Sequence, residues 1–321
     1  MEYKYETLTA NGTRIRAVVE GKGPLCVLVH GWPESWYSWR HQIGPLVDAG
    51  YRVCAIDVRG YGGSDKPAAI EAYAMKELTS DVAGVIDALG ADQAILIGHD
   101  WGAPIVWVTS ILHRARVKAV VGLSVPFLGR PPMPPIELWK QVYKDRFFYQ
   151  IYFQEPGVAE REFEADVRTA LRKVYFAASG DASSAEQGAT AAKPPTSTML
   201  EGLTDPNPFP AWLSEADLDY FTGEFERSGF RGSLNRYRAQ GIDFEALPQL
   251  AVEKITQPAL FIAGSRDPVL RFIPGVSMLD RMDGHYDDLR GKVVIDGAGH
   301  WIQQERPEAV NAAIVEFLKK L

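Results

Sequence analysis

The sequence predicts an α/β protein in which a mostly parallel sheet is flanked by helices and interrupted by one helical insertion. Continuous apolar runs, typical of strands covered on both faces, alternate with helical patterns. This alternation stops near residue 130 and resumes near residue 248. A chain of 321 residues is long enough for one large domain with such an insertion. We therefore expect a core formed by residues 1–129 and 248–321, and a helical cap domain formed by residues 130–247.

The first elements are predicted from a turn signal and from apolar runs. Residues 3–21 contain two alternating segments joined at Asn11-Gly12, a dipeptide preferred in the type I′ turns of hairpins. Buried strands and helices then alternate along the chain. The strands are predicted in 24–31, 51–65 (which ends in a glycine-rich loop), 94–100 and 117–126, and the helices at 81–90 and 102–115.

The last elements resume the α/β pattern after the insertion. Strands are predicted at 257–269 and 292–300, followed by an amphipathic closing helix at 306–321. The insertion itself is helical, aromatic and irregular, and it begins with the proline cluster "RPPMPP". Its Ala/Ser/Gly-rich stretch, residues 177–193, predicts a mobile loop.

The composition is that of an ordinary soluble globular protein, with 46% hydrophobic and 23% charged residues. A net charge of −7 disfavours nucleic acid and anionic membrane surfaces as partners. The chain has neither an apolar run of about 20 residues nor a signal-peptide core, so we expect no membrane span and a cytoplasmic location. Cys26 and Cys54 lie in apolar runs without CxxC or metal-binding spacing, which predicts two buried thiols and no metal site.

One predicted strand ends in Gly98-His99-Asp100-Trp101-Gly102 and is followed by a helix. This is the context of a nucleophile elbow, Gly-x-Nu-x-Gly, in which small residues on both sides permit a tight strand-to-helix turn. The chain contains no Gly-x-Ser-x-Gly, so Asp100 is the candidate nucleophile. The alternative is an aspartate that only caps the N-terminus of the following helix.

Residues from three other loops complete the candidate site. The "HGWPES" loop follows the first buried strand, and the backbone N–H groups of Trp32 and Trp101 are the expected oxyanion-hole donors. Asp267 and His300 end later strands, so the chain order is nucleophile, acid, base. Because the carboxyl ends of parallel strands share one edge of the sheet, we expect these groups to meet there. The predicted base is His300, oriented by Asp267.

Seven segments together resemble one enzyme family. They are "HGWPES", "DVRGYGGSD", "GHDWG", "FFYQIYFQEPGVAE", "GSLNRYR", "GSRDPV" and "GAGHW". Over nearly its full length the chain resembles the epoxide hydrolases of the α/β-hydrolase superfamily, both the soluble mammalian type and its actinobacterial relatives. The resemblance implies the α/β-hydrolase fold, with a mostly parallel eight-stranded sheet flanked by helices and an inserted helical cap, or lid. It also implies that Tyr149 and Tyr237 of the cap activate the epoxide; Tyr152, one helical turn from Tyr149, is the alternative.

The resemblance implies hydrolysis of an epoxide to a vicinal diol, with no cofactor. An aspartate is already ionised at neutral pH, so Asp100 can attack a saturated carbon and form a covalent alkyl-enzyme ester. The two cap tyrosines would polarise and protonate the leaving oxygen. A water activated by His300 and Asp267 would then hydrolyse the ester.

The expected substrate is a small apolar epoxide, because the cap is rich in aromatic residues. The predicted substrate contacts are Trp32, Trp101 and Phe148. Further candidates for the pocket wall, each equally well explained by core packing, are Trp139, Trp212, Phe221 and Phe225. The sequence leaves open which epoxide binds, with what regio- and stereoselectivity, whether the role is detoxification or lipid metabolism, and whether the chain forms a homodimer.

Two other functions are consistent with parts of this pattern. A haloalkane dehalogenase would use the same Asp-His-Asp triad, and Trp32 offers the second N–H donor that a halide requires. The paired cap tyrosines argue against it, because a halide leaves without a proton. A ligand-binding protein on the same scaffold predicts damaged catalytic positions. All five predicted catalytic positions are intact.

Overall fold

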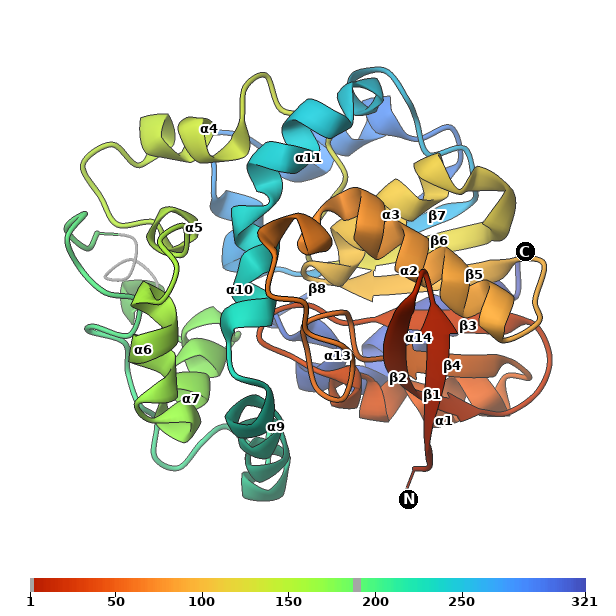
Figure 1. The fold of residues 1–321 in the computed structure, drawn as a ribbon, viewed down its shortest axis with the longest axis horizontal. Coiled ribbons are helices and arrows are strands. Elements are labelled where there is room, and N and C mark those ends of the chain that lie inside the picture. Colours follow the sequence, from red (N-terminus) through yellow and green to blue (C-terminus); the bar gives the residue numbers. More distant parts are fainter. Residues whose placement is uncertain (1–2, 187–191) are drawn as a thin grey trace.

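Residues 3–186 and 192–321 are described by the structure, a computed structural model (Figure 1). Within these residues, eight strands form one sheet in the order β1-β2-β4-β3-β5-β6-β7-β8. The strands are β1 (Tyr5–Ala10), β2 (Thr13–Glu20), β3 (Leu25–Val29), β4 (Arg52–Ile56), β5 (Ala94–His99), β6 (Val117–Leu123), β7 (Ala259–Gly264) and β8 (Leu289–Ile295). Among the described strands only β2 runs opposite to all the others, so the predicted mostly parallel sheet is confirmed.

The antiparallel edge of the sheet is the predicted hairpin. Asn11 and Gly12 join β1 to β2 with φ angles of 50° and 69°, the left-handed values that a type I′ turn requires at both central residues. The turn therefore fixes a register in which Ala10 pairs with Thr13.

The central strands are covered on both faces, which explains their unbroken apolar sequences. In β3, Leu25, Val27 and Val29 pack into one hydrophobic cluster, while Cys26 and Leu28 pack into the cluster on the other face. Helices α2 (Met75–Ala88) and α3 (Gly102–Leu112) contribute to the first cluster, and α1 (Arg40–Asp48) and α14 (Pro307–Leu318) to the second. The short helices α12 (Met278–Arg281) and α13 (Ile302–Glu305) flank β8 in sequence.

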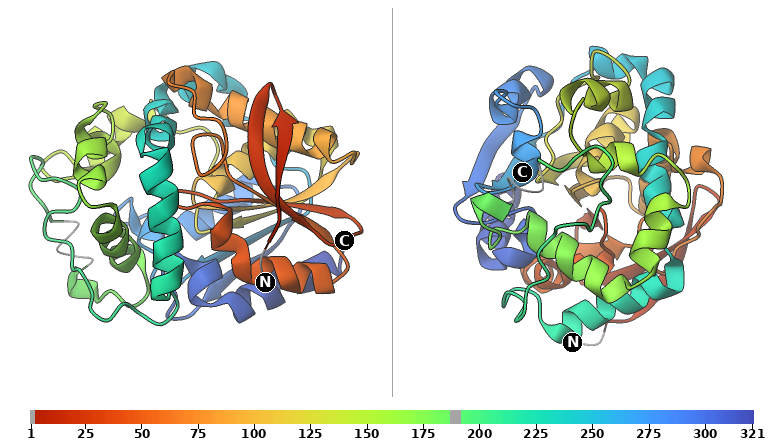
Figure 2. Two further views of the ribbon diagram at one scale, coloured as in Figure 1. Left: turned by 60° about the horizontal axis from the view of Figure 1, so that its bottom comes forward. Right: turned by 90° about the vertical axis from the view of Figure 1, so that its left-hand side faces the viewer.

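The insertion between β6 and β7 is the helical cap. Figure 2 shows its helices gathered on one side of the sheet. Its helices with described bounds are α4 (Pro135–Val142), α5 (Tyr149–Tyr152), α6 (Val158–Glu164), α7 (Val167–Ala178), α9 (Glu215–Ser228), α10 (Arg231–Arg238) and α11 (Gln240–Ala246). Of the stretch predicted as a loop, residues 177 and 178 belong to α7, and residues 187–191 lie outside the described part of the chain.

Direct hydrogen bonds hold the cap against the core. The Tyr175 hydroxyl of α7 donates to the Pro33 carbonyl at 2.6 Å, and the Trp301 indole donates to the Tyr175 carbonyl at 2.7 Å. The backbone N–H of His300 donates to the carbonyl of Ala178 at 2.9 Å. The loop that carries the predicted base is thus bonded to the cap as well as to the sheet.

Two predicted strands are shorter in the structure. β7 ends at Gly264 and β8 at Ile295, so Asp267 and His300 lie in the loops after these strands rather than at their last positions. Gly297, with φ of 71°, turns the chain away from the strand direction after β8. The loops that carry Asp267 and His300 still follow each other in the predicted order, and they lie at the predicted edge of the sheet.

The remaining expectations concern cysteines and membranes. Cys26 and Cys54 are free and buried as predicted, and burial raises the pKa of each thiol to about 12. None of the helices in residues 3–186 and 192–321 has the length and apolar character required to cross a membrane.

The elbow glycine at the start of α3 gives a test of the fold. A Cβ added to Gly102 would lie 1.9 Å from the Val29 carbonyl oxygen, which is backbone and has no room to move. We expect Gly102→Ala to lower the free energy of unfolding by about 1–3 kcal/mol or more. The control is Gly44→Ala in α1, where nothing lies within 4 Å of the added Cβ. This change should raise stability by up to about 1 kcal/mol. Urea denaturation measures both; equal effects of the two changes would contradict the packing argument.

Candidate active site

Asp100 lies in the turn between β5 and α3. Its φ is 49°, a left-handed value that non-glycine residues rarely adopt. The turn is tight because β5 and α3 approach closely: a Cβ on Gly98 would lie 2.2 Å from the Gly102 carbonyl oxygen. Trp101 is the N-cap residue of α3, and its side chain makes no capping hydrogen bond. Among the described residues the Asp100 carboxylate bonds only to groups from other loops, so it does not act as a helix cap.

Each oxygen of the Asp100 carboxylate has its own partner. Oδ1 accepts a hydrogen bond from the backbone N–H of Trp32 at 2.7 Å, and Oδ2 lies 3.2 Å from Nε2 of His300. Trp32 and Asp100 are thus brought together from the loops after β3 and β5. The Trp101 N–H makes no hydrogen bond to this carboxylate in the described structure, and its role as a second oxyanion donor stays a prediction.

His300 is held between two carboxylates. Its Nδ1 lies 3.1 Å from both oxygens of Asp267, while Nε2 faces Asp100. Asp267 also accepts a hydrogen bond from the Val269 N–H at 2.9 Å, which fixes the orientation of its side chain. Asp267 is fully buried and His300 is only 4% exposed, so bulk water does not screen these contacts.

The charge around His300 changes its acidity. Burial by itself lowers the pKa of the imidazole, but the negative charge of Asp267 and the hydrogen bonds to Asp100 and Asp267 raise it well above the ordinary value. The two neighbouring carboxylates thus favour the protonated form of the imidazole. Losing either charge would lower the pKa of His300.

A buried glutamate fixes the loops around the nucleophile. Glu34 accepts hydrogen bonds from the Gly31 N–H at 2.9 Å and from the Gln303 amide at 2.9 Å. Nδ1 of His99 lies 2.8 Å from the same carboxylate, and Nε2 of His99 lies 2.8 Å from the His300 carbonyl. Burial alone would raise the pKa of Glu34, but the nearby His99 and the hydrogen bonds lower it to about 2. His99 thus connects the "HGWPES" loop to the loop of the predicted base.

A second buried carboxylate holds the His300 loop from the other side. Glu305 accepts backbone N–H bonds from Gly180, Gly299 and Trp301 at 2.9, 2.8 and 3.0 Å. Burial raises the pKa of Glu305, and the three N–H donors act in the opposite direction. One side chain therefore ties the residues on both sides of His300 to the cap.

The two predicted tyrosines come from different cap helices, and their rings are in contact. Tyr149 begins α5 and Tyr237 lies in α10; their ring centroids are 5.8 Å apart. Burial raises the pKa of both hydroxyls, and the negative charge of Asp100 raises them further. Both hydroxyls therefore stay protonated at neutral pH. The Tyr149 oxygen accepts a hydrogen bond from the Gln150 amide at 3.1 Å, which leaves its own proton free to donate.

Tyr152, the alternative to Tyr149, points to a different partner. Its hydroxyl donates to Glu162 at 2.9 Å, outside the group formed by Asp100 and the two buried tyrosines. The rings of two predicted substrate contacts, Trp32 and Phe148, pack against other aromatic rings. The Trp32 ring lies against Phe153, Phe163 and Tyr237, and the Phe148 ring stacks on Tyr143 with centroids 4.2 Å apart.

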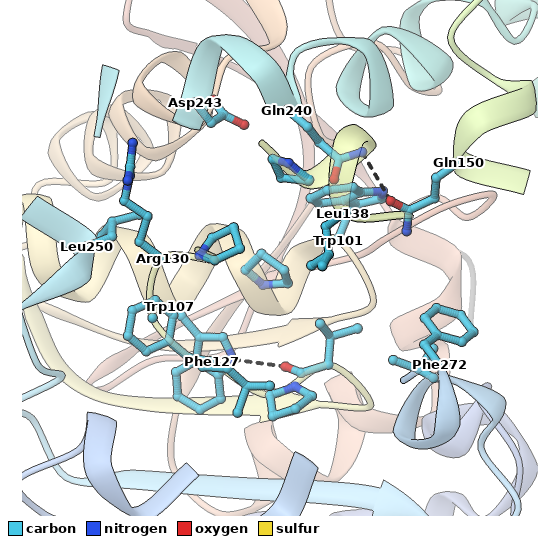
Figure 3. Close-up of a pocket in the computed structure, with 18 of the residues that line it drawn as sticks. Trp101, Trp107, Phe127, Arg130, Leu138, Gln150, Gln240, Asp243, Leu250 and Phe272 are labelled. Atoms are coloured by element: carbon cyan, nitrogen blue, oxygen red, sulfur yellow. Dashed lines mark hydrogen bonds between the residues drawn. The ribbon is translucent and has the colours of Figure 1, made fainter. Parts of the chain in front are cut away.

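A cavity of about 350 Å³ lies between the cap and the core (Figure 3). Asp100 and Tyr149 both line it, and the rest of the wall is mainly apolar. Of the predicted substrate contacts, Trp101 lines the cavity, whereas Trp32 and Phe148 do not, and their contact with substrate stays a prediction. Of the further candidates Trp139 lines it, and Trp212, Phe221 and Phe225 do not.

Proteins of one family match the chain over nearly its whole length. Residues 24–174 match the family described as alpha/beta hydrolase fold. Epoxide hydrolase A of Mycobacterium tuberculosis is 45% identical, over 97% of this chain and 96% of its own. The chain belongs to the epoxide hydrolase family. Epoxide hydrolase 2 of Siraitia grosvenorii is 39% identical, over 99% of this chain and 98% of its own.

Solved structures of epoxide hydrolases share the fold. An epoxide hydrolase from an endophytic Streptomyces has a TM-score of 0.94 at 43% identity, covering 99% of this chain and 95% of that chain. Epoxide hydrolase A from Mycobacterium thermoresistibile has a TM-score of 0.92 at 44% identity, covering 99% and 98%. The predicted family and the predicted α/β-hydrolase fold are confirmed.

In this epoxide hydrolase, Gln150 is a site residue that the sequence did not single out. Its amide oxygen accepts a hydrogen bond from the Gln240 amide at 3.1 Å (Figure 3). The same oxygen accepts a second hydrogen bond from the Trp139 indole at 3.0 Å. These two bonds fix which end of the Gln150 amide faces Tyr149. The available signal was its position directly after Tyr149 in the first cap segment.

The pKa of His300 provides a test of the site geometry. We expect Asp100→Asn to lower it, because the amide removes the negative charge opposite Nε2 and so destabilises the imidazolium, while Asp267 remains. NMR titration of the His300 ring in both proteins measures the change. Asp48→Asn, on an exposed position of α1, should leave the value unaltered. An unchanged pKa in Asp100→Asn would exclude a charge contact between these residues.

Proposed function

We propose that this protein hydrolyses an epoxide to a vicinal diol through a covalent ester on Asp100. The observation that supports it most directly is that one apolar cavity is lined by both the Asp100 carboxylate and the Tyr149 phenol. A nucleophile on one side of an epoxide and an acid on the other are the two groups that opening the ring requires. The curated relatives named epoxide hydrolases support the same reaction.

Ring opening begins with an oriented carboxylate. The Trp32 N–H holds Oδ1 of Asp100, so Oδ2 is the oxygen that attacks the epoxide carbon. The carbon–oxygen bond of the ring breaks as the ester bond forms, and the electron pair moves to the epoxide oxygen. An alkoxide has about the basicity of hydroxide (water's pKa is roughly 15.7), so it must be protonated as it leaves.

The cap tyrosines supply that proton. Because burial keeps Tyr149 and Tyr237 protonated, both donate hydrogen bonds to the epoxide oxygen, and one then transfers its proton. The Gln150 amide bonded to the Tyr149 oxygen stabilises the phenolate that this leaves. A halide leaving group would need no such proton.

Ester formation also prepares the second step. The ester of Asp100 carries no negative charge, so one of the two charges that raise the pKa of His300 disappears. The imidazolium therefore gives up its proton more readily, by way of water, to the phenolate that ring opening left on the cap tyrosine. The neutral ring can then accept a proton from the attacking water. That water attacks the carbonyl carbon of Asp100, and the resulting oxyanion forms on Oδ1, where the Trp32 N–H already donates. Collapse of the oxyanion breaks the bond between this carbon and Oδ2, and the departing alkoxide takes the proton from His300, which completes the diol. The Asp100 carboxyl then ionises and returns its proton to His300.

Trapping the ester tests the function and the base together. His300→Gln should form the ester from styrene oxide and not release it, because no group remains to activate the water. Intact-protein mass spectrometry should show the mass of the variant plus one whole epoxide. A haloalkane dehalogenase would instead trap an alkyl group from a 1-haloalkane, with release of halide.

The control for this experiment is His113→Gln, at the C-terminus of α3, which should turn over styrene oxide without an adduct. Diol formation at the normal rate by His300→Gln would exclude His300 as the base. Halide release without any diol from the unaltered protein would exclude the epoxide reaction itself.

The role of Tyr149 is tested by a pair of neighbouring substitutions. Tyr149→Phe removes an acid that faces the cavity, so single-turnover ester formation should slow by about a hundredfold or more. Tyr152→Phe removes a hydroxyl that contacts Glu162 and should leave this rate nearly unchanged. Stopped-flow measurement of both variants decides the assignment. A larger loss in Tyr152→Phe would show that the assignment within the cap is off by one helical turn.

A further inference from the structure

The cavity lies on one side of the strand that carries the nucleophile. The loops after β5, β6 and β7 contribute Asp100, Phe127 and Phe272 to its wall. In the sheet β6 and β7 follow β5 on one side, whereas β3 and β4 lie on the other side. No described residue of the loops after β3 and β4 lines the cavity. Asp100 is therefore at one end of this space rather than in its middle.

The other side of Asp100 is filled by aromatic rings. Trp32, from the loop after β3, donates its backbone N–H to Oδ1 of Asp100 and so lies directly beside the nucleophile. The Trp32 ring contacts Phe153, Phe163 and Tyr237, with centroids 5.1, 5.5 and 5.8 Å apart. Each of these four side chains is at most 4% exposed, and none of them lines the cavity. Close packing of this kind leaves no room for a further ligand group.

Phe153 connects these packed rings to the proposed acids. Its ring centroid lies 5.5 Å from that of Tyr149 and 5.1 Å from that of Tyr237. Tyr149 lines the cavity and Phe153 does not. The boundary between free space and packed side chains thus passes beside the groups that hold the epoxide oxygen in the proposed reaction.

We propose that Trp32 and Phe153 are specificity-determining residues, which confine one of the two ring carbons of the epoxide and require it to be unsubstituted. The proposal rests on the proposed function and names its substrate class, terminal epoxides with an apolar chain. With the oxygen at Tyr149 and Asp100 on the opposite face of the ring, substituents on one carbon extend along the cavity. A substituent on the other carbon meets the rings of Trp32 and Phe153, and an added methyl group in a packed site is destabilising.

Two isomeric epoxides test this selectivity, 1,2-epoxy-2-methylhexane and trans-2,3-epoxyheptane. They carry the same butyl chain and one methyl group. The methyl group lies on the same ring carbon as the chain in the first isomer and on the other ring carbon in the second. In the unaltered protein we expect kcat/KM to be about 10- to 100-fold higher for the first isomer, measured as diol formation over a range of substrate concentrations.

Two substitutions that remove ring volume should reduce this preference. Phe153→Leu makes room for the second methyl group, and so does Trp32→Leu, which retains the backbone N–H to Asp100. The ratio of kcat/KM between the isomers should fall by about fivefold or more in each variant. A ratio does not depend on the fraction of folded protein, and the intrinsic reactivities of the isomers are the same in every variant. A change in the ratio therefore reports the shape of the site.

The matched control is Phe225→Leu, a buried cap residue whose ring contacts Tyr61 and Phe230, and its ratio should equal that of the unaltered protein. A ratio near one in the unaltered protein would overturn the proposal. An unchanged ratio in both Phe153→Leu and Trp32→Leu, or an equal fall in Phe225→Leu, would overturn it as well. Absence of diol from both isomers and from 1,2-epoxyhexane would instead refute the proposed function, so the two failures are distinguishable.

Discussion

The proposed chemistry depends on one constraint: the imidazole of His300 is buried between the carboxylates of Asp100 and Asp267. Two buried negative charges are costly unless a cation lies between them, so the imidazolium stabilises the resting site. The sheet makes this arrangement available, because β5, β7 and β8 run parallel and their following loops meet at one edge. In the proposed reaction, ester formation removes the charge of Asp100 and so allows His300 to act as a base. The charge of Asp100 thus connects the two proposed half-reactions, because its loss in the first lowers the pKa of His300 for the second.

Much of the fold was predictable because its signals are local. β3 and β5 are buried at every position, so their sequences are continuously apolar, and Asn11-Gly12 specifies the hairpin by its backbone preferences alone. The ends of β7 and β8 were not predictable in this way. Gly297 turns the chain after β8, although Ala298 beyond the turn is still buried, so the strand predicted at 292–300 extends past the real end.

The same division applies to the candidate site. Asp100, Asp267 and His300 stand out in the sequence because each follows an apolar run, and the structure brings all three together. Tyr149 lies in an aromatic stripe, and only the family resemblance distinguished it from Tyr152. Other contacts depend on residues far apart in the chain, which no local pattern reveals. The Trp32 ring lies against Phe153 and the Phe148 ring stacks on Tyr143. The side chains of Gln150 and Arg130 each form a hydrogen bond with a residue of α11.

The hydrogen bonds between α7 and the core have a consequence for how such proteins can diversify. The backbone N–H of His300 donates a hydrogen bond to the Ala178 carbonyl, and Tyr175 forms hydrogen bonds with both Pro33 and Trp301. The cap is therefore not an interchangeable module. A chimera that exchanged the whole insertion between relatives would have to transplant matching partners for the base loop. Exchanges confined to α4 and α11, which border the cavity, leave the hydrogen bonds between α7 and the core intact. They change only the cavity wall, and so they are the simplest route to new substrates.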